Sequence, residues 1–82
     1  MQITFKFYNP EVFSGMENGP REITEGATIA QAMEELYERE EGITSERYLD
    51  FVIFLLNKAP AHPGSPLFDG DEVLVLRKSY GG

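Results

Sequence analysis

Residues 66–77 read PLFDGDEVLVLR, and this stretch decides the fold of the 82-residue chain. Leu67 is an apolar anchor, Asp69-Gly70-Asp71 predicts a tight turn, and the residues that follow predict a strand over 72–77. Because positions 73–76 are all apolar, both faces of this strand should be covered. One face of the strand can pack on the core of the domain. The other apolar face must be shielded from water by something else.

The segments around this stretch predict four more strands. Residues 2–8 alternate between apolar and polar side chains, as in a strand with one buried face. After a loop at residues 9–20, a short strand is expected at residues 21–25, as the return arm of a hairpin. A third strand lies within residues 48–57, and a very short fourth one is expected within residues 58–66.

One helix is expected to begin after Thr28, which is a good N-cap and forms a capping box with Gln31. Glu35 and Arg39 have the spacing of a favourable ion pair on the helix surface, and Gly42 is a plausible C-terminal cap. The apolar side chains recur at helical spacing and make one stripe: Ile29, Ala32, Met33, Leu36 and Tyr37. One helix and one sheet make a two-layer α+β domain.

A single helix covers one face of the sheet, so the other face should carry an apolar patch that requires a partner. On the last strand we expect Val73 and Val75 to point inward and Leu74 and Leu76 to point outward. Tyr8 is out of phase with the core face of the first strand and should join the outward side chains. The alternative is a set of partly exposed side chains without a partner. The sequence leaves open which residues of the third strand point outward.

The composition narrows the classes of partner. Seven basic and fourteen acidic residues give a formal net charge of −7. This charge disfavours nucleic acid and favours a protein with a basic surface, although acidity can also serve solubility alone. The sequence shows no signal peptide and no apolar run long enough to span a bilayer, so a cytoplasmic protein without a membrane partner is expected.

The chain offers little catalytic chemistry of its own. It has no cysteine, and its single histidine, His62, is expected to be a solvated loop residue. No standard zinc site can be built from these, and no phosphate-binding G-x-x-x-x-G-K-[ST] loop is present, so neither a metal nor a bound cofactor is expected. The serines have no evident triad partners. We therefore expect a protein that is not an enzyme by itself.

The sequence ends in Gly81-Gly82. A diglycine can pass through a narrow channel that side chains would block, so the carboxylate of Gly82 is the expected reactive group and Gly81 provides clearance. We divide the chain into a domain at residues 1–77 and a flexible C-terminal diglycine tail at residues 78–82.

Residues 66–73, PLFDGDEV, together with the terminal diglycine resemble the signature of the β-grasp sulfur-carrier family. The nearest resemblance is to the small subunit of molybdopterin synthase, with the thiamine-pathway sulfur carrier and ubiquitin-like modifiers as relatives. Residues 25–30 resemble the family's entrance to its helix, and Asn57 resembles the asparagine that ends its third strand. The resemblance implies a ubiquitin-like β-grasp fold, with a mixed sheet of four to five strands whose first and last strands are parallel neighbours at its centre.

The resemblance also implies a mechanism and partners. A separate adenylating (E1-like) enzyme would use ATP to attach AMP to Gly82, and sulfur would replace AMP to give a thiocarboxylate. A larger sulfur-acceptor subunit, such as the large subunit of molybdopterin synthase, would receive that sulfur. The residues expected to bind partners lie on the outward face and at the root of the tail: Tyr8, Leu74, Leu76, Arg77 and Lys78.

The sequence departs from the family where the tail begins. The family often has two prolines there, whereas this chain has Arg77-Lys78, as in ubiquitin-like tails. Conjugation of Gly82 to lysine amines of other proteins is therefore a second hypothesis. A third, of a different class, is a β-grasp interaction module in which the diglycine has no role.

Overall fold

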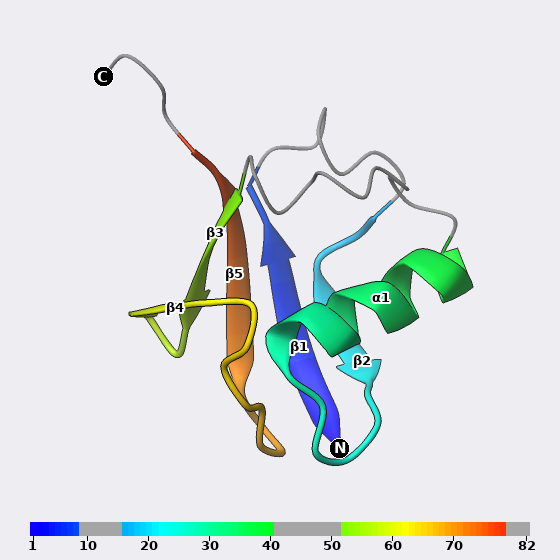
Figure 1. Ribbon diagram of the computed structural model, residues 1–82. Coiled ribbons are helices and arrows are strands. Elements are labelled where there is room, and N and C mark those ends of the chain that lie inside the picture. The colour runs from blue at the N-terminus through cyan, green and yellow to red at the C-terminus, as the bar shows by residue number, and fades with distance from the viewer. Residues whose placement is uncertain (9–15, 41–51, 79–82) are drawn as a thin grey trace.

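The computed structural model describes residues 1–8, 16–40 and 52–78, which form a mixed sheet with one helix lying across it (Figure 1). The helix is α1 (Ile29–Glu40). The strands, in chain order, are β1 (Gln2–Phe7), β2 (Gly19–Glu22), β3 (Val52–Leu56), β4 (Ala59–Ala61) and β5 (Glu72–Arg77).

The strand order in the sheet is β2-β1-β5-β3-β4. β1 and β5 pair in parallel at the centre, and the other neighbours pair antiparallel. This is the β-grasp arrangement, so the expected fold class is confirmed; the described residues form five strands and one helix, with a parallel pair at the centre of the sheet. The bounds of β5 are those predicted from the sequence.

β2 differs from its expected position. It was expected at residues 21–25 and is found at Gly19–Glu22, so the last two residues of the expected loop, Gly19 and Pro20, belong to the strand. Pro20 is tolerated because β2 is an edge strand, where a missing N–H costs no ladder hydrogen bond. Beyond Glu22 the chain leaves the sheet, and Ile23 is buried in the core. The antiparallel hairpin with β1 is confirmed.

The core lies between α1 and the inner face of the sheet, as the alternation predicts. The buried side chains come from every layer of the domain: Ile3, Phe5, Phe7, Val52, Phe54, Val73 and Val75 from the sheet, Ile29, Ala32, Met33 and Leu36 from the helix, and Met16, Ile23, Ala27 and Leu67 from the connections. Tyr37 packs against this cluster while half-buried.

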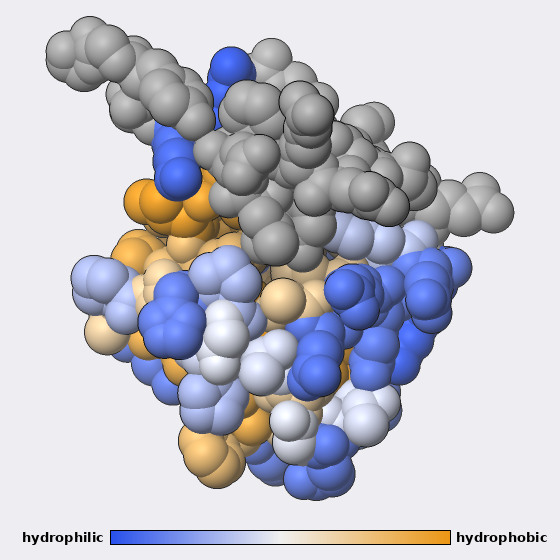
Figure 2. Space-filling model, in the orientation of Figure 1, coloured by the Kyte–Doolittle hydropathy of each residue, from blue (hydrophilic) through white to orange (hydrophobic). Residues whose placement is uncertain are grey.

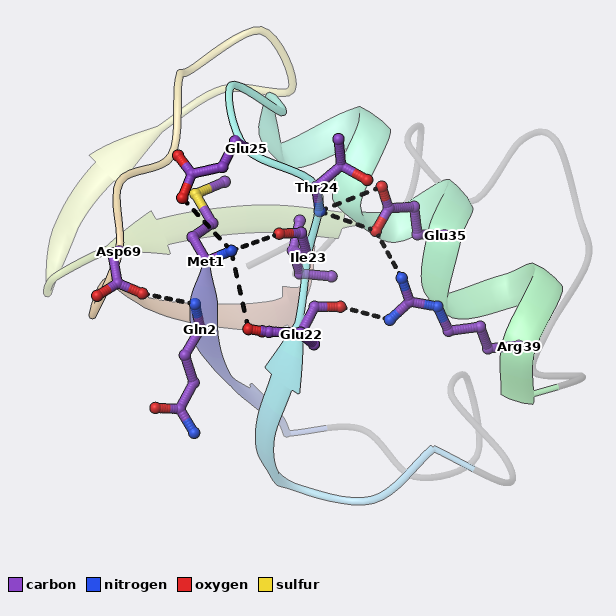
Figure 3. Close-up of polar contacts among 9 residues, drawn as sticks. All are labelled: Met1, Gln2, Glu22, Ile23, Thr24, Glu25, Glu35, Arg39 and Asp69. Atoms are coloured by element: carbon purple, nitrogen blue, oxygen red, sulfur yellow. Dashed lines mark hydrogen bonds and ion pairs between the residues drawn. The ribbon is translucent and has the colours of Figure 1, made fainter.

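The start of α1 is fixed by its own sequence. Thr28 N donates to Gln31 Oε1 at 2.9 Å, and Gln31 N donates to Thr28 Oγ1 at 3.2 Å, which confirms the capping box. The ion pair between Glu35 and Arg39 is present at 3.0 Å. Figure 3 shows that this pair also reaches the β2 side of the molecule, because Arg39 donates to the carbonyl of Glu22. The expected cap at Gly42 lies outside the described residues.

The turn before β5 is held by its own aspartates. Asp71 Oδ2 accepts from Phe68 N at 2.8 Å, and Asp71 Oδ1 accepts from Asn57 Nδ2 at 2.9 Å. Asp69 Oδ1 accepts from Gln2 N at 2.7 Å, a contact seen in Figure 3. Asp69 therefore ties the turn to the start of β1, and Asp71 ties it to the β3–β4 hairpin.

Asn57 and Lys58 form the two-residue connection between β3 and β4, and both have positive φ, 51° and 71°. Two positive φ values in a two-residue hairpin loop are typical of a type I′ turn, for which Asn-Gly is the preferred pair. Asn57 suits its position, whereas Lys58 occupies a position that favours glycine. The backbone of this turn therefore carries a small conformational cost.

We expect Lys58→Gly to stabilise the protein by about 0.5–1 kcal/mol. Relief of the left-handed conformation is worth about 1–2 kcal/mol and exceeds the extra entropy that glycine gives the unfolded chain. Equilibrium urea unfolding measures this difference.

Gly70 provides the matched control, because it has φ 89° and an added Cβ would meet no atom within 4 Å. Gly70→Ala should therefore destabilise by about 1 kcal/mol through the backbone alone. If Lys58→Gly is destabilising instead, the side chain of Lys58 stabilises the folded domain and our interpretation of the turn is wrong.

Candidate functional site

The face of the sheet opposite α1 carries the apolar residues expected there. On β5, Val73 and Val75 are fully buried, while Leu74 and Leu76 point the other way and are half-buried. Tyr8 is 54% exposed and follows β1 on the same face, and its backbone N–H donates to Val75 O at 3.1 Å. The predicted inward and outward faces of the last strand are therefore confirmed.

β3 adds two residues that the sequence left unassigned. Val52 and Phe54 are buried, so Ile53 and Leu55 point outward, and Ile53 is 43% exposed. Ile53 lies opposite Leu76. We call the resulting surface the outer patch, and it comprises five side chains: Tyr8, Ile53, Leu55, Leu74 and Leu76. Five contiguous apolar side chains on one face are unusual for a domain that acts without a partner.

The outer patch has a polar border on the β1 side. Lys6 points to the same face of the sheet, and its Nζ lies 3.4 Å from Glu72 Oε2. Both side chains remain partly exposed, so this ion pair contributes little to stability by itself. Lys6 lies beside Leu74 on the adjacent strand, so the ion pair borders the outer patch there, and Tyr8 is the member of the patch that follows β1.

Figure 2 shows the opposite side of the molecule, where the surface around α1 is largely hydrophilic. Gln31, Glu34 and Glu38 are exposed along the helix. The helix side of the domain is therefore polar and the sheet face opposite it is apolar. A partner with an apolar surface would bind to the sheet face.

The tail begins next to the outer patch. Arg77 ends β5 one residue after Leu76, and Lys78 follows it; both are exposed. The predicted reactive residues Gly81 and Gly82 lie outside the described residues. The structure thus brings Tyr8, Leu74 and Leu76 together, and it places Arg77 and Lys78 at the end of the sheet that leads toward the diglycine.

One open hollow of about 400 Å³ lies near the beginning of α1. Its lining includes Glu35, whose carboxylate accepts from Thr24 N and pairs with Arg39 (Figure 3). Within residues 1–8, 16–40 and 52–78, no group of three or more acidic or histidine side chains is arranged to hold a metal ion. No helix in this same part of the chain is long and apolar enough to cross a membrane.

His62 stabilises the turn in which it lies. Its Nδ1 accepts from Gly64 N at 3.2 Å, and its backbone N–H donates to Ser65 Oγ at 3.1 Å. The exposed loop position expected from the sequence is observed.

Comparison with known proteins places these features in a family. A family model described as the ThiS family matches residues 17–82. No curated protein sequence matches the chain at a significant level. The matched segment contains β5, most of the outer patch and the diglycine.

Solved structures share the fold at low sequence identity. Small archaeal modifier protein 1 from Haloferax volcanii has a TM-score of 0.70 and 18% identity, with 95% of this chain and 98% of that chain covered. A chain from the complex of subunits 1 and 2 of the Helicobacter pylori molybdopterin-converting factor has a TM-score of 0.62 and 23% identity, with 100% of both chains covered. Urm1 from Trypanosoma brucei has a TM-score of 0.67 and 16% identity, with 99% of this chain and 95% of that chain covered.

Proposed function

The chain belongs to the ThiS family, and from this premise we propose that it is a sulfur carrier whose reactive group is the carboxylate of Gly82. The family comprises small β-grasp sulfur carriers related to ubiquitin-like modifiers. In this proposal the domain supplies recognition, the tail supplies the reacting atom, and other proteins supply the catalytic groups.

The proposed chemistry has two steps on the tail. A carboxylate oxygen of Gly82 attacks the α-phosphorus of ATP on an adenylating enzyme, which releases pyrophosphate and leaves an acyl adenylate. A hydrosulfide-equivalent donor then attacks the acyl carbon and displaces AMP, which leaves a thiocarboxylate. The carrier binds no cofactor itself, because ATP is bound by the enzyme. The consumption of ATP fits a cytoplasmic reaction.

The observation that carries this proposal is the position of the outer patch beside the root of the tail. A partner that covers Leu76 and Ile53 is one residue away from Arg77, where the last strand ends. Docking there confines the five residues 78–82 to the neighbourhood of the partner's active site. Such confinement holds the reacting groups close together without local acid–base groups. Proximity of this kind can lower a reaction barrier by several kcal/mol.

We propose that the sulfur acceptor is a larger subunit acting in molybdopterin biosynthesis or a related pathway. The Helicobacter pylori relative is described in complex with subunit 2 of its converting factor. The same docking surface would serve the adenylating enzyme at an earlier stage, with Tyr8, Leu74 and Leu76 in the contact and Arg77 and Lys78 guiding the tail. The two partners would then bind one after the other.

The second candidate is a ubiquitin-like modifier joined through Gly82 to lysine amines. The basic pair Arg77-Lys78, in place of prolines, is the feature that favours it. Both candidates share the adenylation step and differ in the nucleophile that attacks Gly82. The domain boundary between residues 1–77 and the tail at 78–82 is common to both.

Reconstitution separates the candidates. The chain is incubated with the adenylating enzyme and the larger subunit of its own source, ATP and a sulfide donor, and its mass is followed. A carrier should gain a thiocarboxylate on Gly82 and lose it to the acceptor. A modifier should instead appear in an isopeptide bond to lysine. If Gly82 keeps an unmodified carboxylate in the complete mixture, the domain is an interaction module and both candidates are wrong.

A further inference from the structure

The ion pair between Lys6 and Glu72 lies where a protein that docks on the outer patch would cover it. Lys6 is opposite Leu74 on the adjacent strand, and Glu72 precedes Leu74 by two residues on β5, so both charged side chains point to the outer face. Covering an ion pair removes both charges from water, and this cost is offset only when further polar groups bind them. A docking partner must therefore supply polar groups at this border as well as an apolar surface.

Glu72 is the member of the pair that the fold holds in place. Its backbone N–H donates to Asn57 Oδ1 at 2.9 Å, and its carbonyl accepts from Asn57 N at 2.8 Å. Among the residues that the structure describes, its carboxylate accepts no hydrogen bond and is paired only with Lys6, whose Nζ lies 3.4 Å from Oε2. A carboxylate has two oxygens that can each accept more than one hydrogen bond. Most of the accepting capacity of Glu72 is therefore available to a partner.

The charges around Glu72 favour a basic group on the partner. Asp69 and Asp71 precede Glu72, and both remain anionic because the hydrogen bonds that they accept come from neutral amide groups. Two ammonium groups, those of Lys6 and Lys58, lie at this end of the sheet, so the three carboxylates are in excess. The whole chain is also acidic, with a formal net charge of −7. A basic side chain is therefore attracted to this border, whereas a partner's carboxylate would be repelled.

We propose that Glu72 orients the adenylating enzyme on the outer patch by binding an arginine or lysine side chain of that enzyme. The inference rests on the proposed function, and it concerns the adenylating enzyme because both candidate functions require it. Apolar contact is non-directional and would leave the enzyme free to turn on the patch. Glu72 and Arg77 are the two ends of β5, about 16–17 Å apart. A charge pair at Glu72 therefore fixes the direction in which the tail enters the enzyme.

Isosteric substitution tests whether the carboxylate binds the enzyme. The affinity of the full chain for its purified adenylating enzyme is measured by calorimetric titration at low and at raised salt. Glu72→Gln should weaken binding about 10-fold at low salt, and its affinity should fall less steeply with added salt than that of the unaltered chain. Glu34→Gln removes the same charge from an exposed position on α1, so its affinity should stay within about twofold.

Lys6→Met separates a contact with the enzyme from a purely intramolecular role of the ion pair. The substitution removes the cation that competes for Glu72, so binding should become about two- to fivefold tighter, in keeping with the small strength of an exposed ion pair. A chain with both Lys6→Met and Glu72→Gln should bind as Glu72→Gln alone does, because the gain depends on the carboxylate. A gain that persists in the double variant would instead come from apolar contact of the methionine, and would contradict the proposal.

The remaining outcomes distinguish this inference from the proposed function. Unchanged binding of Glu72→Gln, or weaker binding of Lys6→Met, would overturn the inference, since the enzyme would then ignore the carboxylate or bind the ammonium group. If Leu76→Glu weakens binding and Gly82 of the unaltered chain is adenylated in the same experiments, the proposed function stands even when the inference fails. An enzyme that neither binds nor adenylates the unaltered chain would contradict the proposed function itself.

Discussion

A chain that ends at Tyr80 is expected to lose carrier activity by at least about 10³-fold while it keeps its fold. The reacting carboxylate would then be two residues short of the position that the partner's active site is built to receive, and the loss of a positioned reactive group removes most of the proximity contribution. β5 ends at Arg77, and its ladders with β1 and β3 are made by residues 72–77. Single-turnover adenylation by the partner enzyme, together with thermal unfolding, measures both effects.

Gly81→Leu is the companion variant, because it keeps the carboxylate and adds bulk beside it. If Gly81 provides clearance, this variant should adenylate far more slowly than the unaltered chain while binding the enzyme through the outer patch. Full activity of the chain ending at Tyr80 would show that the diglycine has no role, which is the behaviour of a pure interaction module.

Leu76→Glu is expected to weaken binding to the adenylating enzyme and to the larger acceptor subunit about 100-fold. The substitution places a carboxylate at the centre of the outer patch, where docking would remove it from water without a partner charge. Because Leu76 points away from the core, the free energy of unfolding should change by less than about 1 kcal/mol. Calorimetric titration with each purified partner gives the affinity, and urea unfolding gives the stability.

Three other variants complete this test. Ile53→Glu should behave as Leu76→Glu does, because the two residues are opposite each other on adjacent strands. Gln31→Glu adds the same charge on the helix face and preserves the capping box, so its binding should be unaffected. Val75→Glu should unfold the protein, since Val75 is fully buried. Normal binding by Leu76→Glu would remove the outer patch from the docking surface.

Sequence periodicity predicted which side chains are buried in strands that have one apolar and one polar face. It gave no prediction for strands that are apolar on both faces. Residues 2–8 alternate, so the core face of β1 could be assigned before the structure was known. The run FVIFLL at residues 51–56 is apolar throughout, and alternation therefore gives no way to choose between Ile53 and Phe54 as the outward residue. That choice depends on the register with β5, which is a long-range property.

Local turn signals had a similar limit. Gly19 and Pro20 are common turn residues, yet both lie in β2 because an edge strand tolerates them. The positive φ of Lys58 carries no local signature, since the Asn-Lys pair lacks the glycine typical of this turn. The two contacts of Asp71 also join residues that only the folded chain brings together. Of the candidate site, the outward residues of β5 were predictable and those of β3 were not.

Intact mass spectrometry of the protein purified from its native host bears most directly on the role of Gly82. We predict a population in which one oxygen of the chain is replaced by sulfur, with fragmentation assigning that sulfur to the C-terminal glycine. The same change should appear when the purified chain is treated with its adenylating enzyme, ATP and a sulfide donor. A Gly82 carboxylate that stays unmodified both in the host and in this mixture would contradict the proposal that this domain carries sulfur.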